Sequence, residues 1–340
     1  MQIIRETVIC LSDCCIKGRL LILEAANQKL HHKSKLTSKM SMIYRNTVQN
    51  KHLLFLVLPV FIYYVIFHYI PMYGVVISFK KYIPGQGLFQ GEWVGLKWFI
   101  SFFKSFYFPR LIKNTFLLSF YGLLWGFPIP IIFALALNEV RNNTFKRTVQ
   151  TISYLPHFIS VVVVVGMMFN FLSPTSGIIN NFIKSMGKEP ISFLNDASKF
   201  RTLYISSGIW QSFGWDSIVY LASISSIDAQ LYEASRIDGC NRLQQIAYVT
   251  IPGIMPTIII LLILRMGSLL SVGYEKIILM YNPATYQVAD VISTYVYRRG
   301  IIGAEYSFAA AVGLFNSAVN FIFLFIVNRI SKKIADISLW

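Results

Sequence analysis

The chain has 340 residues, of which 55% are hydrophobic and 14% are charged, whereas ordinary soluble domains carry about 25% charged residues. With a mean hydropathy of +0.56, this composition predicts a membrane protein with several spans and argues against a soluble globular domain. The net charge of +16 does not indicate nucleic-acid binding, because Lys and Arg are spread over the loops between apolar segments. A basic balance suits a bacterial membrane protein that faces anionic lipid.

Residues 1–50 precede the first long apolar segment. We expect a cytoplasmic tail rather than a signal peptide, because charged residues between Asp13 and Glu24 interrupt its apolar stretch and no small-residue cleavage site follows. The four cysteines of the chain form no C-x-x-C pair and no cluster with histidine at zinc spacing. The sequence therefore predicts free thiols and no metal site.

Six apolar segments are each long enough to cross a bilayer, which takes about 20 residues. They cover residues 53–79, 115–138, 152–173, 203–227, 256–279 and 306–328. These segments predict an all-α polytopic membrane protein with six transmembrane helices, in which residues 51–340 form one membrane domain. The fifth segment contains Gly267 and Gly273, so we expect this span to be bent or partly unwound.

The distribution of Lys and Arg predicts which loops face the cytoplasm. With the N-terminus inside, the inside segments hold more Lys and Arg than the outside loops, and most of the difference comes from the tail. Four lysines between Lys29 and Lys39 lie close to the first span, where this rule carries most weight. Both termini and the polar loop at residues 228–255 are therefore expected to be cytoplasmic.

The loop at residues 80–113, between the first two spans, is rich in aromatic residues. Residues 96–108 have the pattern of an amphipathic helix at the membrane surface, with rings at headgroup depth and with Lys97 and Lys104 as anchors. A docking surface for an external partner is the alternative interpretation.

The polar loop at residues 228–255 begins with a predicted short helix over residues 230–238. Ser226 or Asp228 is placed to cap its start, and Gly239 is placed to end it with a positive φ angle. Apolar side chains at i, i+3 and i+6 give this helix one apolar stripe, namely Leu231, Ala234 and Ile237. Glu233 falls on a different face, where it is free to accept hydrogen bonds.

A second short helix is predicted after the glycine. Asn241 is expected to cap it, with Gln244 as the capping-box partner. Pro252 and Pro256 are expected to end this helix and to begin the fifth span. Two short helices bent at a glycine can enter a cleft in a soluble protein, and a helical connection without a partner is the equally open alternative.

The pattern E-A-S…G…V-x-I-P resembles the "EAA" signature of permeases in binding-protein-dependent ABC importers. It is formed by Glu233, Ala234, Ser235, Gly239, Val249, Ile251 and Pro252. Ser235 stands where the family has a second alanine, and Ile251 where it has leucine. Residues 52–340 resemble the maltose-type sugar permeases, most of all the branch that imports oligosaccharides and polysaccharides. The stretches that carry this likeness are 69–74, 93–96, 149–160, 328–331 and 338–340.

The resemblance implies a type I ABC importer permease in the bacterial cell (inner) membrane. It implies pairing with a second homologous permease, docking on a cytoplasmic ATPase dimer, and delivery of an oligosaccharide by an extracytoplasmic solute-binding protein. By the same analogy the ATPase-coupling residues are Glu233, Ala234, Ser235, Asp238, Gly239 and Pro252. The chain contains no G-x-x-x-x-G-K-[ST] phosphate loop. We therefore expect a transport subunit without enzymatic activity or a cofactor of its own, with ATP and Mg bound by the partner ATPase.

Aromatic rings and fixed polar groups recognise sugars, and such residues lie in and around spans four to six. The candidates for the substrate path are Trp210, Trp215, Asp216, Tyr220, Tyr274, Glu275, Asn282 and Asn316. Structural alternatives stay open for three of them. Asp216 can form a salt bridge with Arg265 in the adjacent span. Glu275 can be a surface group at the wet end of span five, and Asn316 can join helices.

Two other functions remain as alternatives. The first is a permease for amino acids, phosphate or metal ions. The extent of the likeness to the oligosaccharide branch argues against it. A metal importer should also show a cluster of His, Cys and carboxylates. A polytopic membrane enzyme, such as a lipid-linked glycosyltransferase, needs clustered acidic residues that hold a metal ion. No D-x-D motif occurs in the chain.

Overall fold

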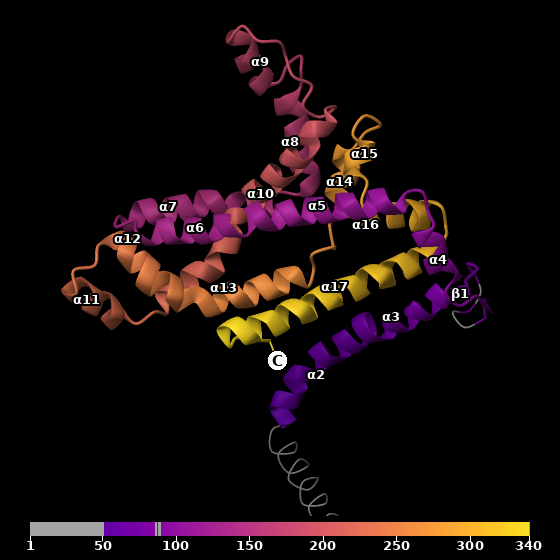
Figure 1. The fold of residues 1–340 in the computed structure, drawn as a ribbon, viewed down its shortest axis with the longest axis horizontal. Helices are drawn as coiled ribbons and strands as arrows, with labels where there is room; N and C mark the ends of the chain where they lie inside the picture. Colours follow the sequence, from indigo (N-terminus) through magenta and orange to yellow (C-terminus); the bar gives the residue numbers. More distant parts are fainter. Residues whose placement is uncertain (1–50, 86, 88–89, 340) are drawn as a thin grey trace, which may run out of the picture. The chain divides into compact units, whose positions relative to one another are not determined.

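The computed structural model describes residues 51–85, 87 and 90–339. The predicted cytoplasmic tail at residues 1–50, with three of the four cysteines, lies outside the described residues. Helices dominate the described part, in which one small sheet pairs β1 (Lys80–Lys81) with β2 (Glu92–Trp93) (Figure 1). The chain divides into two units, 1–73 and 74–340, and each is considered by itself.

The described part of the first unit is helical and apolar. It consists of α2 (Lys51–Tyr64), the π-helical η1 (Val65–Tyr69) and α3 (Ile70–Met72), and the 3-10 helix η2 (Tyr73–Phe79) follows. Phe55–Phe79 is long and apolar enough to cross a membrane. This result confirms the first predicted span to within two residues.

The second unit contains the remaining helices. They are α4 (Lys97–Phe103), α5 (Phe108–Gly126), α6 (Pro128–Asn138), α7 (Asn143–Tyr154), η3 (Leu155–Phe158), α8 (Val161–Leu172), α9 (Ile178–Ser185), α10 (Ala197–Ser225), α11 (Ala229–Ile237), α12 (Arg242–Gln245), η4 (Ile246–Thr250), α13 (Ile251–Met266), α14 (Tyr274–Met280), α15 (Tyr286–Ala289), α16 (Ile292–Val296), η5 (Tyr297–Ile302) and α17 (Tyr306–Ala335). Phe108–Asn138 and Tyr306–Ala335 are each long and apolar enough to span a membrane. They contain the second and sixth predicted spans and extend beyond them.

The third predicted span, at residues 152–173, is not one continuous helix. Asn143–Phe158 and Val161–Leu172 form a pair bent by 100°. Pro156 removes a backbone donor near the bend, and the Ser160 hydroxyl accepts a hydrogen bond from the N–H of Val163 at the start of α8. A helix stop and a new N-cap therefore lie within a few residues of each other, and the chain changes direction between them.

The fourth predicted span corresponds to α10, which begins at Ala197 rather than Leu203. Its 29 residues give a length of about 43 Å at 1.5 Å per residue, enough to cross a bilayer. However, α10 is not among the described helices that are apolar enough to be candidate spans. It packs against α5, α6, α7 and α13, so much of its surface faces protein rather than lipid.

The fifth predicted span has different bounds from those expected. A single helix runs over Arg242–Met266, so neither Pro252 nor Pro256 separates the coupling loop from the span. As predicted, the span is interrupted at its glycines: the helix ends at Met266, before Gly267, and α14 begins after Gly273. In the break, the side chain of Asn320 accepts a hydrogen bond from the N–H of Leu270 at 2.9 Å, which replaces a lost helical partner.

Two π-helical turns explain how helices continue through proline. The turn η1 precedes Ile70-Pro71, and η4 precedes Ile251-Pro252. In each turn the isoleucine N–H bonds to the carbonyl five residues earlier. A π turn shifts the hydrogen-bond register by one residue. The helix can therefore continue through the following proline, although proline has no N–H to donate.

The surface helix predicted at residues 96–108 is shorter than expected, because α4 ends at Phe103 and α5 begins at Phe108. One face of α4 turns into the protein: Phe102 is 1% exposed and packs with Tyr295 and Phe308. Phe106, in the following turn, is 87% exposed. Only part of this aromatic segment is therefore available to a membrane surface or to a partner.

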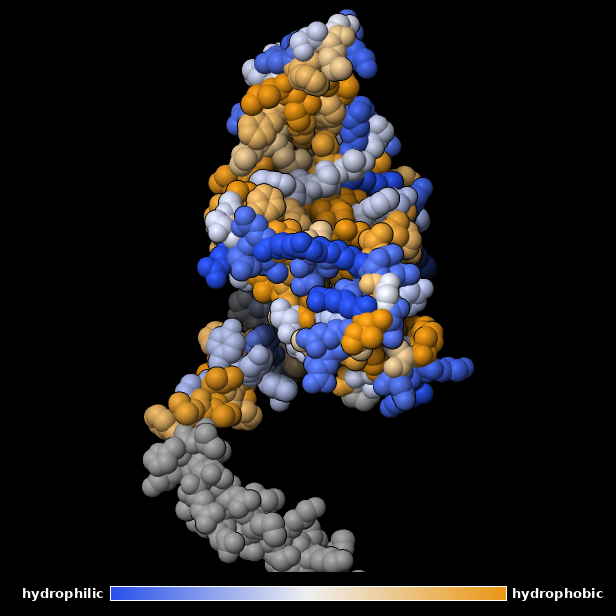
Figure 2. All heavy atoms as spheres, turned by 90° about the vertical axis from the view of Figure 1, so that its left-hand side faces the viewer, coloured by the Kyte–Doolittle hydropathy of each residue, from blue (hydrophilic) through white to orange (hydrophobic). Residues whose placement is uncertain are grey.

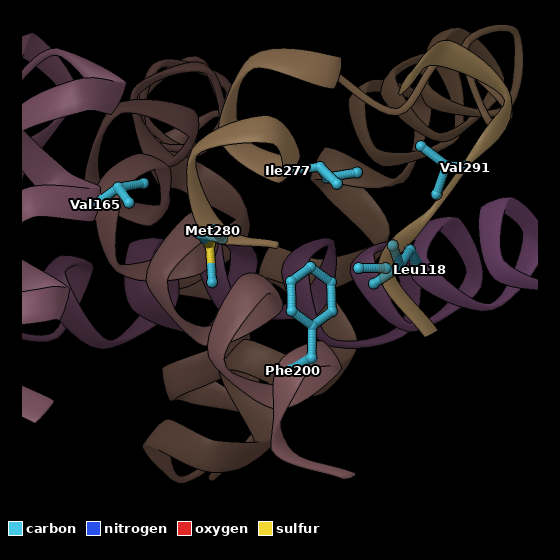
Figure 3. Close-up of a cluster of buried hydrophobic side chains, with 7 residues drawn as sticks. Leu118, Val165, Phe200, Ile277, Met280 and Val291 are labelled. Carbon is cyan, nitrogen blue, oxygen red and sulfur yellow. The ribbon is translucent and has the colours of Figure 1, made fainter. Parts of the chain in front are cut away.

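A buried apolar cluster fixes the orientation of α10. Phe200, near the start of α10, packs in a cluster with Leu118 of α5, Val165 of α8 and Met280 of α14 (Figure 3). Successive side chains on a helix are about 100° apart. With Phe200 held in this core, the next residue, Arg201, faces a different side of the helix.

The crossing of α10 and α7 depends on a glycine. A Cβ added to Gly214 would lie 2.2 Å from the carbonyl oxygen of Ser153, which is backbone and cannot rotate away. We therefore expect Gly214→Ala to lower the free energy of unfolding by about 1–3 kcal/mol, the usual cost of overpacking. Thermal unfolding of the purified chain in detergent measures it.

Gly166→Ala is the matched control, because Gly166 also lies in a helix, α8, but has open space around its Cβ position. Alanine is the better helix former by about 0.5–1 kcal/mol, so this variant should be unchanged or more stable. Equal destabilisation of both variants would contradict the close approach of α7 and α10.

Candidate coupling loop and transport path

The first helix of the polar loop, α11, has well-defined caps. The side chain of Asp228 accepts a hydrogen bond from the N–H of Gln230 at 2.9 Å, so Asp228 rather than Ser226 is the N-cap. At the other end Gly239 has φ +80°, and the N–H of Cys240 bonds to the carbonyl of Ser235 at 2.9 Å. These bonds form a glycine-dependent helix stop and confirm the predicted bend.

The second helix starts with the predicted capping box. Gln244 N–H donates to the Asn241 side chain at 2.9 Å, and Asn241 N–H donates to the Gln244 side chain at 2.8 Å. With reciprocal capping on one side and a glycine stop on the other, only four residues, 238–241, separate the two helices. The turn therefore has little freedom to change its angle.

Tyrosine and threonine hydroxyls hold α11 against the helix that follows. Tyr232 Oη and Thr250 Oγ1 lie 3.0 Å apart, and Thr250 is 1% exposed. Ser235 is buried, and its hydroxyl donates to the Tyr232 carbonyl at 2.8 Å. Ser235 thus faces the protein and is not exposed to a partner.

The other predicted coupling residues are accessible. Glu233, Ala234, Asp238 and Gly239 are exposed on α11 and its end, and Pro252 is exposed on α13. Two residues of the predicted apolar stripe are also exposed, Leu231 at 55% and Ile237 at 87%. These two side chains therefore stay largely uncovered by the residues that the structure describes.

A polar hollow of about 890 Å³ lies beside these residues. It is lined by Asn138, Glu139, Val140, Arg141, Ala229, Tyr232, Glu233, Arg236, Cys240, Asn241, Arg242 and Gln245. Figure 2 views the chain from the side of α11 and α12 and shows hydrophilic side chains gathered there, with hydrophobic ones between them. Arg242 and Glu139 form an ion pair at 3.5 Å across the hollow. Glu139 and Arg141 are not among the residues predicted for this loop; they follow directly after the second predicted span, residues 115–138.

Three of the predicted path residues do meet. Trp215, Asp216 and Tyr220 line a cavity of about 350 Å³ together with Arg265 of α13 and Gly126 of α5. Arg265 Nη1 lies 3.9 Å from Asp216 Oδ2. The salt bridge that the sequence left open as a structural alternative therefore occurs inside the candidate path.

The other path candidates are dispersed. Trp210 lines a separate cavity of about 470 Å³ with Met167 and Met168 of α8. Tyr274 stacks on Tyr297, with ring centroids 5.1 Å apart. Glu275 is exposed in the first turn of α14.

Two asparagines among the candidates differ in their surroundings. The Asn282 amide donates to the carbonyl of Leu194 at 3.0 Å and to the side chain of Asn195 at 2.9 Å, so Asn282 ties two loops together. Asn316 is half-buried in α17, and its Oδ1 has no hydrogen-bond partner among the described residues.

An ionic cluster that sequence reasoning missed centres on Asp290. Its side chain is fully buried and accepts hydrogen bonds from Arg298 at 3.2 and 3.1 Å, from Arg110 at 3.4 Å and from Thr294 at 2.8 Å. Arg110 lies 180 residues away in the sequence, so no local signal connects the two. The cluster joins α5 to α16 and η5. No group of His, Cys, Asp or Glu in the described part of the chain could hold a metal ion.

The predominantly helical fold, its long apolar helices and its capped polar loop define a multi-pass membrane transport subunit. Residues 126–336 match the family model for the "Binding-protein-dependent transport system inner membrane component". The chain therefore belongs to this family of ABC importer permeases, which are transport subunits and not enzymes.

Two relatives from Bacillus subtilis (strain 168) align over most of their length. Protein LplB is 45% identical over 285 residues, which is 84% of this chain and 90% of LplB. The polygalacturonan/rhamnogalacturonan transport system permease protein YteP is 44% identical over 289 residues, 85% of this chain and 90% of YteP.

Two solved structures are similar throughout. One is a chain of a bacterial ABC transporter involved in the import of the acidic polysaccharide alginate, with a TM-score of 0.79 and 45% identity over 86% of this chain and 99% of that one. The other comes from a bacterial alginate ABC transporter in complex with an alginate pentasaccharide-bound periplasmic protein, with a TM-score of 0.80 and 44% identity over 87% and 99%.

Proposed function

We propose that this chain forms half of the translocation path of an ATP-driven importer of oligosaccharides or polysaccharides. The support for this cargo is the polysaccharide transport for which YteP and the alginate transporter are named, each matched over most of both chains. A permease for a different solute is the alternative, and substrate uptake distinguishes the two.

We further propose that the loop around Glu233 and Gly239 docks on a cytoplasmic ATPase. The observation that carries this proposal is a rigid turn, capped on both sides, that presents Glu233 beside a polar hollow. The Glu233 carboxylate makes no hydrogen bond or ion pair with another side chain or backbone group that the structure describes. A carboxylate held in water by a rigid helix is available for polar contacts with another protein.

The proposed assembly places both termini and this loop in the cytoplasm. It pairs the chain with a second homologous permease, an ATPase dimer that binds ATP and Mg, and an extracytoplasmic solute-binding protein. The binding protein in the complexed alginate transporter supports the last partner. The permease itself then needs no cofactor.

A continuous helix offers a route from the loop to the path. Arg242–Met266 starts beside the coupling turn and contains, near its end, Arg265, the partner of Asp216. Movement of α11, transmitted through Tyr232 and Thr250, would carry Arg265 with it as part of one rigid element. Alternating access by rigid-body motion of packed helices has this form.

Glu233→Ala tests the docking role. Removing a hydrogen-bonded charge at an interface costs about 2–5 kcal/mol, so we expect ATP-dependent oligosaccharide uptake to fall at least tenfold and co-purification of the ATPase to weaken. The assay uses cells that express the full chain with its native partner subunits.

Glu189→Ala is the matched control, because Glu189 is an exposed glutamate in the loop between α9 and α10, outside the coupling loop. It should leave uptake unchanged. Normal uptake and ATPase association in Glu233→Ala would refute the docking role. Uptake of another solute, and of no saccharide, would instead support the alternative cargo.

A further inference from the structure

A second cavity, about 550 Å³ in volume, lies between α5 and the first half of α10. Its lining combines two aromatic rings, three serine and threonine hydroxyl groups, one guanidinium group and aliphatic side chains. The residues are Tyr121, Trp125, Ile129, Ser198, Arg201, Thr202, Ile205, Ser206 and Ile209. The volume is in the range of small-molecule sites. The lining thus carries one positive charge and no carboxylate.

Arg201 has no acidic partner. None of the salt bridges among the described residues includes it, and its Nε is buried without a hydrogen-bond partner. Two neighbouring cations, Arg110 and Arg298, already share Asp290. Because a guanidinium removed from water without an anion is costly, Arg201 provides a place where a ligand carboxylate would be stabilised.

The guanidinium of Arg201 is held in position. Arg201 Nη2 donates to Asn114 Oδ1 at 3.0 Å. Asn114 is itself 2% exposed, and its amide donates to the carbonyls of Gln287 and Asp290 at 2.8 and 3.0 Å. These bonds aim the Asn114 oxygen at Arg201. The chain therefore uses one N–H of the guanidinium to orient it and leaves others for a ligand.

The aromatic wall suits the flat face of a sugar ring. Tyr121 and Trp125 are four residues apart on α5, so they are neighbours on one helix face. They are 37% and 58% exposed, so their rings are available for stacking. The Thr202 hydroxyl can donate or accept a hydrogen bond with a sugar hydroxyl. The hydroxyls of Ser198 and Ser206 already donate to the Asp196 side chain and to the Leu203 carbonyl, and they can accept from a sugar hydroxyl.

This cavity adjoins the one at Asp216. The residues at 201, 205, 212 and 216 follow helical spacing and share one face of α10. Gly126 lines the Asp216 cavity, and a Cβ added there would lie 3.6 Å from Arg265 Nη2 and 3.7 Å from Ile209 Cγ1. Ile209 lines the Arg201 cavity, so Gly126 lies beside a residue of each lining.

We propose that the Arg201 cavity binds a uronate residue of an acidic oligosaccharide in transit, with the carboxylate on the Arg201 guanidinium and the ring against Tyr121 and Trp125. The cavity thereby selects acidic over neutral saccharides. This inference rests on the proposed function, since it assigns a class of cargo to the same path. Arg201 is the specificity-determining residue, and Asn114 is a positioning residue.

The test measures binding of tetragalacturonate, and of its fully methyl-esterified form, to the purified full chain in lipid nanodiscs. The ester keeps the rings and loses the charge. A charged hydrogen bond contributes about 1.5–3 kcal/mol, so the acid should bind at least about tenfold more tightly than the ester. Arg201→Gln should remove this preference, to within about twofold, while Arg201→Lys retains part of it.

Lys199→Gln is the matched control, because it removes a nearby positive charge that is paired with Asp196 and is absent from the cavity lining. It should keep the full preference for the acid. The proposal is overturned if the wild-type chain binds neither probe, shows no preference for the acid, or keeps its preference in Arg201→Gln. If Arg201→Gln does not fold, equal binding of the acid and the ester by the wild-type chain still overturns the proposal.

A separate uptake assay in cells keeps the two proposals apart. A charge preference in nanodiscs without ATP-dependent saccharide uptake would refute the proposed import function and leave the binding site standing. Saccharide uptake without a charge preference would leave import standing and refute the site.

Discussion

Gly239→Val is expected to lower ATP-dependent uptake at least about tenfold, because valine strongly disfavours the positive φ angle of +80° at this position. Placing an L-residue in this region costs roughly 1–2 kcal/mol, and a β-branched side chain is among the least tolerant. A steric clash is not the cause of the expected loss, since a Cβ at Gly239 would meet nothing within 4 Å. Uptake by cells with the native partner subunits measures the effect.

Two variants isolate the backbone angle as the cause. Gly239→Asn should keep most uptake, because asparagine adopts positive φ angles more readily than other non-glycine residues. Gly187→Val introduces the same strain at φ +75°, again with open space around the Cβ position, in the loop between α9 and α10. It should leave uptake nearly unchanged. Equal losses in Gly187→Val and Gly239→Val would show that the defect is in folding rather than in coupling.

Asp290→Asn is expected to lower the free energy of unfolding by about 3–5 kcal/mol, because it leaves the charges of Arg110 and Arg298 partly buried without their anion. Asparagine has nearly the same size as aspartate, so the loss in the free energy of unfolding measures the effect of removing the negative charge. Thermal unfolding of the purified chain in detergent is the measurement.

Asp196→Asn is the control for this prediction, because Asp196 is paired with Lys199 at the surface, where ion pairs contribute little. It should change stability hardly at all. The double variant Asp290→Asn with Arg298→Gln should recover part of the loss, since it removes one of the unpaired charges. A small effect of Asp290→Asn alone would contradict the structural role of this cluster.

Local features of the coupling loop could be predicted because each depends on residues a few positions apart. Asp228 reaches Gln230, Asn241 reaches Gln244, and Gly239 provides the angle of the turn by its own lack of a side chain. Sequence could not choose between Asp228 and Ser226, since both can cap a helix start.

Helix limits near proline were predicted less well. Pro252 was expected to separate the loop from the fifth span, whereas a π turn lets the helix continue through it. Pro156 lies near a bend of 100° in the third span instead. The difference is that Ser160 offers a new N-cap after Pro156, and whether a chain uses such a restart depends on the helices packed against it.

Length, composition and hydrophobic periodicity by themselves determined that this protein is a helical, multi-pass membrane protein with a capped polar turn, because these properties depend on transfer to lipid and on short-range hydrogen bonds. Only the tertiary structure decided which distant residues meet. It buried Ser235, paired Asp290 with Arg110 across 180 residues, and placed Arg201 beside Trp125 in one cavity. Such contacts depend on how helices pack, and the sequence near any one residue does not contain that information.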